Sequence, residues 1–91
     1  MKLPRSFTVN GQRWRVVRKK LVHRGLMGLC LYRKREIQVD SELPAVEAAE
    51  TFLHEVLHAC IAERWSSKAE ERLVSRLAPR LLEALGSMGK K

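Results

Sequence analysis

The stretch TFLHEVLHACIAER, residues 51–64, contains the pattern His-Glu-x-x-His at His54, Glu55 and His58 inside a continuous apolar run. Two histidines one turn of α-helix apart project from the same face, so both imidazoles can bind one metal ion. Glu55 lies about 100° around such a helix, beside the histidine face, where a carboxylate suits a base acting on water. The stretch therefore predicts a helix that carries a metal site, with zinc as the expected ion.

A chance match and a solvated helix face are the two alternatives to a metal site. The pattern arises by chance in few chains of this length, because histidine and glutamate are both minor residues. On a solvated face, the histidines would be ordinary polar residues. Leu57 and Ile61 flank them, however, and apolar residues cover the neighbouring side, so we expect the imidazoles at the edge of a buried stripe. The apolar residues are Ala45, Ala48, Ala49, Phe52, Val56, Ala59 and Cys60.

The chain of 91 residues is long enough for one small domain and too short for two. A core of this size lies near the lower limit for autonomous folding, so a bound metal would contribute to stability. The opening MKLPRSF lacks an apolar signal segment, and the longest apolar run, residues 26–32, is too short to span a bilayer. We expect a cytoplasmic protein without membrane contact, in which Cys30 and Cys60 are reduced, partly buried thiols rather than a disulfide.

The basic residues are concentrated in the first part of the sequence. Residues 1–35 contain eleven Lys and Arg residues and no acid, whereas residues 36–91 contain seven bases and ten acids, for a net charge of +8 overall. Such a basic segment attracts nucleic acid or an acidic protein surface. A solvated basic sheet without a partner is the alternative.

A β-hairpin is expected close to the N-terminus. Residues 7–9 and 12–17 alternate between apolar and polar side chains around Asn10-Gly11, a dipeptide that supplies the positive φ angles of a tight turn. Trp14 and Val16 then share one face of the second strand, with basic residues between them. This alternation is typical of a half-buried antiparallel strand.

A second pair of short strands is expected at residues 29–32 and 36–40. Residues 21–28 read as a loop before it, and the lone His23 in that loop is expected to be solvated rather than a metal ligand. The residues expected to point inward are Leu29, Leu31, Ile37 and Val39.

Two helices are expected after the strands. Pro44 suits the first helical position, and apolar periodicity continues from it to about residue 64. Ser67, with Glu70 three residues later, has the spacing of a capping box. A second helix should therefore start near Lys68 and continue to Gly86.

The predicted fold class is α+β: a small antiparallel sheet of three to four strands, then a long helix carrying the zinc ligands and a second C-terminal helix. Pro79 lies inside the second helix and lacks a backbone donor, so it should kink or split that helix. The single domain comprises a basic sheet part at residues 1–40, a two-helix part at residues 41–86 and a disordered tail at residues 87–91.

A catalytic zinc ion usually has three protein ligands and one position for water, so the two histidines need a third partner. The candidates are downstream acids, because no histidine follows His58: Glu63, Glu70, Glu71 and Glu83. Glu63 is turned away from the shared face, and Glu83 lies far along the second helix. The capping box assigns Glu70 to the backbone, which favours Glu71 and leaves Glu70 as the alternative. Either acid could instead be an ordinary carboxylate at a helix N-terminus.

Several phrases of the chain occur together in one known family. They are TFLHEVLHA, the sequence Gly11-Gln12-Arg13-Trp14, Gly28 before Ile37-Gln38-Val39, and EE-x-x-V-x-x-L-A at residues 70–78. On these residues the chain resembles the small His-Glu-x-x-His zinc metallopeptidases of gluzincin type that phages and prophages encode, related in pattern to the ImmA/IrrE and SprT-like groups. The resemblance covers most of the chain, and the helix phrase is its specific part.

The resemblance implies a zinc metalloendopeptidase that holds one Zn²⁺ ion through His54, His58 and Glu71. Glu55 would be the general base, taking a proton from a metal-activated water and passing it to the leaving amine. The substrate would be a protein or peptide lying extended along an exposed sheet edge. The ImmA/IrrE likeness suggests a repressor as target, and the SprT-like likeness suggests a DNA-bound protein. Tyr32 or a nearby arginine is the candidate for stabilising the oxyanion.

A nucleic-acid-binding module is the rival interpretation. The basic residues 1–35 would then be the active surface, and zinc would only brace the fold. No recognised DNA-binding motif occurs in the sequence. The two interpretations differ in the variants that matter: Glu55→Gln for the peptidase, and neutralisation of Arg18, Lys19 and Lys20 for the binding module.

Overall fold

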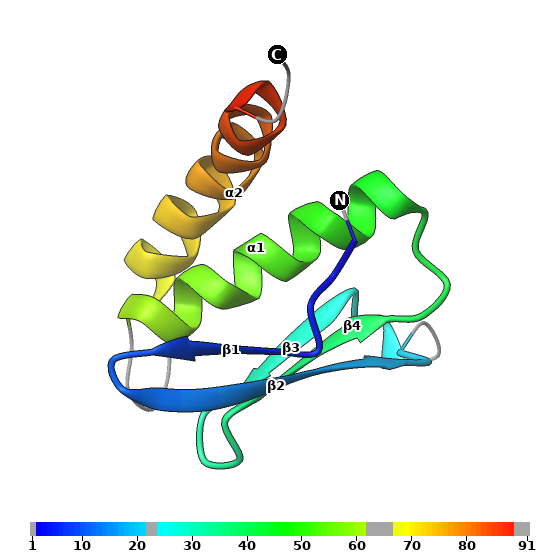
Figure 1. Cartoon of the computed structure of the whole chain (residues 1–91), viewed down its shortest axis with the longest axis vertical. Coiled ribbons are helices and arrows are strands. Elements are labelled where there is room, and N and C mark those ends of the chain that lie inside the picture. Colours follow the sequence, from blue (N-terminus) through cyan, green and yellow to red (C-terminus); the bar gives the residue numbers. More distant parts are fainter. Residues whose placement is uncertain (1, 22–23, 62–66, 89–91) are drawn as a thin grey trace.

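The computed structural model describes residues 2–21, 24–61 and 67–88 of the chain. The fold is α+β, as the sequence predicts: α1 lies on one face of a four-stranded sheet, and α2 packs on the far side of α1 (Figure 1). The elements are β1 (Ser6–Val9), β2 (Gln12–Lys19), β3 (Gly28–Leu31), β4 (Glu36–Asp40), α1 (Ala45–Ile61) and α2 (Lys68–Met88). No helix in these ranges is long and apolar enough to cross a membrane.

The hairpin of β1 and β2 forms as predicted. Asn10 and Gly11 have φ angles of 52° and 74°, the left-handed values that these two residue types tolerate. Phe7 pairs with Trp14 across the two strands, and their rings stack with centroids 6.1 Å apart. This aromatic pair fixes which face of the hairpin is turned toward α1.

The expectation of a purely antiparallel sheet is wrong. The strand order is β1-β2-β4-β3, in which β4 pairs antiparallel with β3 but parallel with β2. All five residues of β4 are buried, so the strand that is covered most completely is the one with a neighbour on each side. The Leu21 N–H donates to Asp40 Oδ1, and the Asp40 N–H donates to Met27 O. These two hydrogen bonds hold both ends of the segment between β2 and β3 against Asp40, the last residue of β4.

The inward faces of β3 and β4 are only partly as predicted. Ile37 and Val39 point toward α1, as expected. Cys30, however, lies opposite Ile37 in the register, so Cys30 faces α1 while Leu29 and Leu31 lie on the opposite face of the sheet. A one-residue difference in register exchanges the two faces of a strand, which is why these leucines are half-buried and outside the core.

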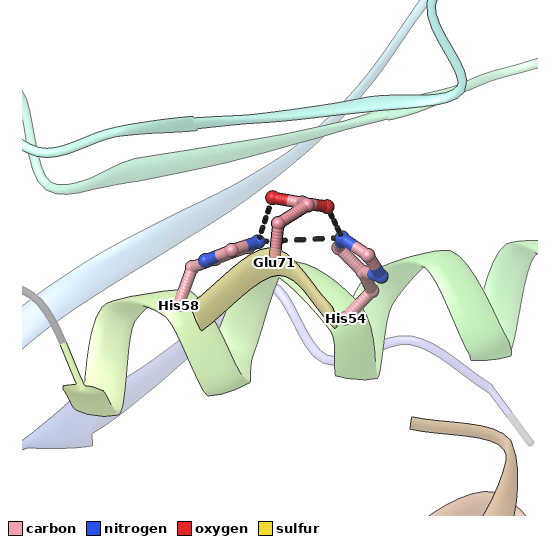
Figure 2. Close-up of side chains that lie close together, drawn as sticks. All are labelled: His54, His58 and Glu71. Carbon is pink, nitrogen blue, oxygen red and sulfur yellow. Dashed lines mark hydrogen bonds and ion pairs between the residues drawn. The ribbon is translucent and has the colours of Figure 1, made fainter. Parts of the chain in front are cut away.

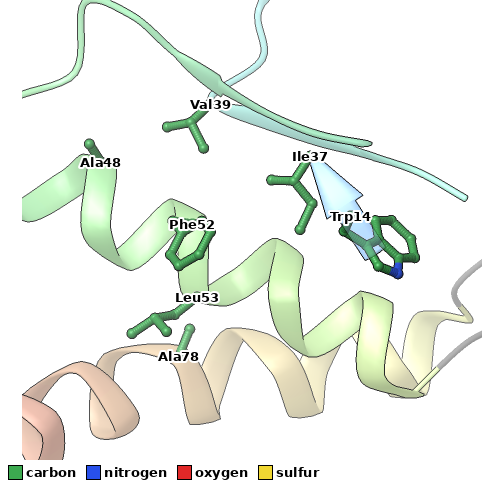
Figure 3. Close-up of a cluster of buried hydrophobic side chains, with 7 residues drawn as sticks. All are labelled: Trp14, Ile37, Val39, Ala48, Phe52, Leu53 and Ala78. Atoms are coloured by element: carbon green, nitrogen blue, oxygen red, sulfur yellow. The ribbon is translucent and has the colours of Figure 1, made fainter. Parts of the chain in front are cut away.

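The core lies between the sheet and α1 and continues to α2 (Figure 3). Phe52 of α1 points toward the sheet, whereas Leu53 points toward α2. The α2 contribution is Ala78, which lies beside Leu53. The buried cluster consists of Trp14, Ile37, Val39, Ala48, Phe52, Leu53 and Ala78.

Both helices begin close to the predicted positions. The Pro44 carbonyl accepts the first helical bond from Ala48 N, so α1 starts one residue after Pro44. The Ser67 carbonyl accepts from Glu71 N, and α2 starts at Lys68. The expected end of the first helix near residue 64 and the environment of His23 lie outside the described residues.

The second helix is not split at Pro79, contrary to one of the two expected outcomes. It continues through Pro79 to Met88. Val74 and Ala78 are fully buried next to the proline, and this packing offsets the single missing backbone donor. Ser87 and Met88 are helical, so the expected tail at residues 87–91 is wrong for its first two residues, and residues 89–91 lie outside the described ranges.

Candidate metal centre

The structure brings His54 and His58 of α1 together with Glu71 in the first turn of α2. Both imidazoles point the same way, and the Glu71 carboxylate spans them (Figure 2). His54 Nε2 lies 2.7 Å from Glu71 Oε1, and His58 Nε2 lies 2.9 Å from Glu71 Oε2. The candidate ligand atoms all lie within 4.8 Å of one another, so this group could hold a metal ion.

The chemistry of these side chains fits a shared cation. The two Nε2 atoms are 3.3 Å apart, and they cannot both direct N–H bonds at each other. The Glu71 carboxylate, which only accepts hydrogen bonds when ionised, lies against both. A metal ion between the three groups would use the lone pair of each nitrogen and neutralise the carboxylate. The set of two imidazoles and one carboxylate is typical of a catalytic zinc site.

Glu70 contacts the other ring nitrogen of His58 from the one that Glu71 contacts. His58 Nδ1 donates to Glu70 Oε2 over 2.6 Å, and the two side chains are only 5% and 11% exposed. Ser67 Oγ accepts from Glu70 N at 3.1 Å, so half of the predicted capping box forms. The Glu70 carboxylate, expected to bond to the backbone at Ser67, binds His58 instead. An ionised carboxylate can only accept, so this contact favours the His58 tautomer that has its proton on Nδ1 and its Nε2 lone pair toward the candidate metal position.

Glu55 is buried next to the histidines, at 9% exposure. Burial raises the pKa of its carboxyl group, Glu71 adds to the rise, and His54 and His58 oppose it. The carboxylate lines a cleft of about 370 Å³ together with His54, Glu71, Thr51 and residues 25–28. The cleft is thus lined by the Glu55 carboxylate and by two of the three candidate metal ligands, His54 and Glu71.

Gly28 lets β3 approach this cleft closely. A Cβ atom at this position would lie 2.6 Å from Thr51 Cγ2, 3.1 Å from the Gln38 carbonyl oxygen and 3.2 Å from Glu55 Oε2. A larger residue would fit there only if the Thr51 side chain, or α1 and the strand, shifted. The sequence offered only a glycine at the start of a strand as a signal for this contact.

Tyr32 does not lie in the cleft. Its ring packs edge-on against Trp14 with centroids 6.2 Å apart, and burial and Cys30 raise the pKa of its hydroxyl group. The described residues that line the cleft include no tyrosine and no arginine, so the structure does not bring the expected oxyanion-stabilising groups to it. Cys30 and Cys60 are free thiols, as predicted, although Cys60 is exposed rather than partly buried.

The other candidate ligands are not part of the group. Glu83 lies in the second half of α2, away from the histidines, and Glu63 lies outside the described residues. The first turn of α2 returns to His54 and His58, which is what a metal ligand from the second helix requires. No family model matches this chain, and no curated protein or solved structure matches it either.

Proposed function

We propose that this protein is a zinc-dependent metalloendopeptidase. His54, His58 and Glu71 would hold one Zn²⁺ ion, and Glu55 would act as general base. The observation that carries the proposal is the meeting of three side chains that could hold a metal ion, two of which, His54 and Glu71, line the same cleft as the buried Glu55 carboxylate. Zinc is favoured over harder ions because imidazole nitrogens supply two of the three protein ligands.

Each side chain has a role in peptide hydrolysis. Zinc held by these ligands supplies a Lewis acid that polarises a peptide carbonyl and makes water more acidic. Glu55 takes a proton from the attacking water and delivers it to the leaving amine nitrogen. Its raised pKa makes the carboxylate a stronger base, and the neighbouring histidines favour its ionised form. Glu70 holds the His58 ring in place through Nδ1.

The β3 strand offers a docking edge for an extended substrate. It is the last strand of the sheet beside β4, and Gly28 at its start lies next to Glu55. A peptide added along this edge would pair with β3 through backbone hydrogen bonds. Its scissile bond would then pass over the cleft that contains His54 and Glu71.

The test compares zinc-loaded wild type with Glu55→Gln on a mixed library of fluorogenic peptides. Wild type should cleave some of these peptides, and Glu55→Gln should lower turnover by about 100-fold or more, because general base catalysis is lost while all zinc ligands remain. Glu50→Gln is the matched control, since exposed Glu50 lines the same cleft without contacting the histidine group. Equal turnover by wild type and Glu55→Gln, or no cleavage by fully zinc-loaded wild type, contradicts the proposal.

The nucleic-acid-binding alternative remains a prediction. Its test was the neutralisation of Arg18, Lys19 and Lys20, and the contacts of Arg18 now restrict that test to the two lysines. The Arg18 guanidinium donates to the Asp40 carbonyl at 3.0 Å, so its neutralisation would also loosen the end of β4. Lys19 is exposed, and Lys20 makes only a 3.7 Å contact with Glu42. Replacing these two lysines alone separates a loss of DNA affinity from a loss of stability.

A further inference from the structure

A second cavity lies between the turns of the two hairpins and the last turn of α1. Its volume is about 550 Å³, and none of the metal-binding residues lines it. The residues that line it include two arginines, Arg33 and Arg35, and two residues with side-chain amides, Asn10 and Gln12. Such a lining is complementary to an anion.

The backbone of Arg35 is in a conformation that arginine disfavours. Its φ angle is 49°, in the left-handed region where a Cβ atom crowds the following carbonyl. The turn fixes this residue on both sides: Arg35 N–H donates to Tyr32 O at 3.3 Å, and Arg35 O accepts from Arg15 N at 2.9 Å. Glycine would close the same turn without strain, so the turn itself does not explain the arginine.

Among the described residues, Arg33 and Arg35 have no ion pair of the kind that other bases of the sheet make. Arg15 contacts Glu36 at 2.7 Å, and Lys20 contacts Glu42 at 3.7 Å. Within residues 2–21, 24–61 and 67–88, no carboxylate oxygen lies within 4.0 Å of Arg33 or Arg35. Two like charges on one cavity repel each other unless an anion lies between them.

We propose that this cavity binds a phosphate group carried by a ligand of nucleotide size. A phosphate monoester has close to two negative charges and three acceptor oxygens, which match two guanidinium groups and the neighbouring amides. The volume falls within the range of small-molecule sites. A free nucleotide and the 5′-terminal phosphate of a nucleic-acid strand share this chemistry. The site is independent of the metal centre and of peptidase activity.

The test is calorimetric titration of the full chain at constant ionic strength, with inorganic phosphate, adenosine monophosphate and adenosine. Both phosphates should bind and adenosine should not. Arg35→Gly should weaken phosphate binding about tenfold or more, because it removes charged hydrogen bonds. Lys34→Gly is the matched control: Lys34 is an exposed base in the same turn, outside the cavity lining, and its variant should keep the wild-type affinity.

Unfolding without ligand gives a second readout. Arg35→Gly should be at least as stable as wild type, because glycine relieves the strain at a φ of 49°. Three results would overturn the proposal. Lower stability of Arg35→Gly would show that the arginine serves the fold, and an equal loss of phosphate affinity in Lys34→Gly would show that binding depends only on the general positive charge of the turn. The third is absence of phosphate binding by wild type. Tighter binding of a 5′-phosphorylated oligonucleotide than of the monophosphate would identify the strand end as the source, and equal binding the free nucleotide.

Discussion

Glu70 and Glu71 are adjacent in sequence but bind different atoms of the histidines. Glu71, with a side chain 50% exposed, lies against the Nε2 atoms of both imidazoles. Glu70, with a side chain 11% exposed, lies on the opposite nitrogen of His58. A carboxylate on the far nitrogen of a metal-binding imidazole fixes its tautomer and ring orientation. The pair therefore divides into a candidate metal ligand, Glu71, and a candidate positioning residue, Glu70.

Single amide substitutions separate these two roles. Glu70→Gln should weaken zinc affinity about 10- to 100-fold, because the amide oxygen still accepts from His58 Nδ1 but carries no charge. Glu71→Gln should weaken it further, since it removes an anionic ligand. Competition with a chromophoric chelator measures both affinities. A larger effect of Glu70→Gln than of Glu71→Gln would exchange the assigned roles.

The Cys30 thiol gives a pH dependence of stability. Burial and the Glu55 carboxylate raise the pKa of Cys30 from its ordinary value of 9.0 to about 12. The unfolded chain loses this proton near pH 9 while the folded chain keeps it, so the stabilisation is fully present below pH 9 and is lost as pH rises toward 12. Urea unfolding between pH 7 and 11 should therefore show a smaller alkaline loss of stability in Cys30→Ala than in Cys60→Ala. Burial also raises the pKa of Cys60, so parallel curves for the two variants would mean that the fold raises the pKa of Cys30 no more than that of Cys60.

At the level of elements, the contact between β3 and α1 depends on one glycine. Gly28→Ala should destabilise the fold by about 1–3 kcal/mol, because the new methyl group overlaps Thr51 and crowds Glu55. Gly86 in α2 provides a control for which the opposite change in stability is expected. No atom lies within 4 Å of a Cβ atom added to Gly86, so Gly86→Ala should stabilise the fold by about 0.5–1 kcal/mol through its higher helix propensity. Chemical denaturation measures both changes. A neutral Gly28→Ala variant would show that the strand and helix have room to separate.

Local sequence signals predicted where each helix or strand begins and ends better than they predicted which strands pair with each other. Asn10-Gly11 and Ser67 identify a turn and a helix start, because each acts on backbone atoms a few residues away. The neighbour of β2 could not be read in this way, since the pairing of β2 with β4 joins segments distant in sequence. The inward face of β3 was also ambiguous, because Leu29 and Leu31 are as apolar as the alternating residues Cys30 and Tyr32.

In the candidate site, too, the sequence predicted contacts within one helix but not contacts between helices. The spacing of His54 and His58 on one helix is enough to predict that their rings point the same way. The partner of Glu70 is not predictable from its own helix: capping would keep the carboxylate local, whereas the tertiary packing of α2 on α1 brings His58 within 2.6 Å. The choice between Glu70 and Glu71 as ligand therefore needed the packing of two helices.

For the whole molecule, the candidate metal centre joins two layers of a small domain. Its histidines come from α1, which packs on the sheet, and Glu71 comes from the outer helix α2. A ligand that binds only the folded state stabilises it by about 2.7 kcal/mol at 100 times its Kd. In a chain of 91 residues this is a large part of the total stability, so zinc should hold α2 on α1 as well as take part in catalysis.

The most direct measurement is the number of zinc ions that remain bound per chain after chelator treatment, reloading and desalting. Wild type and Glu55→Gln should each retain one, because both keep His54, His58 and Glu71. His54→Ala should retain none under the same conditions, and circular dichroism of each variant checks that it is folded. A folded wild type that retains no zinc, or a His54→Ala variant that still retains one ion, would contradict the metal centre described above.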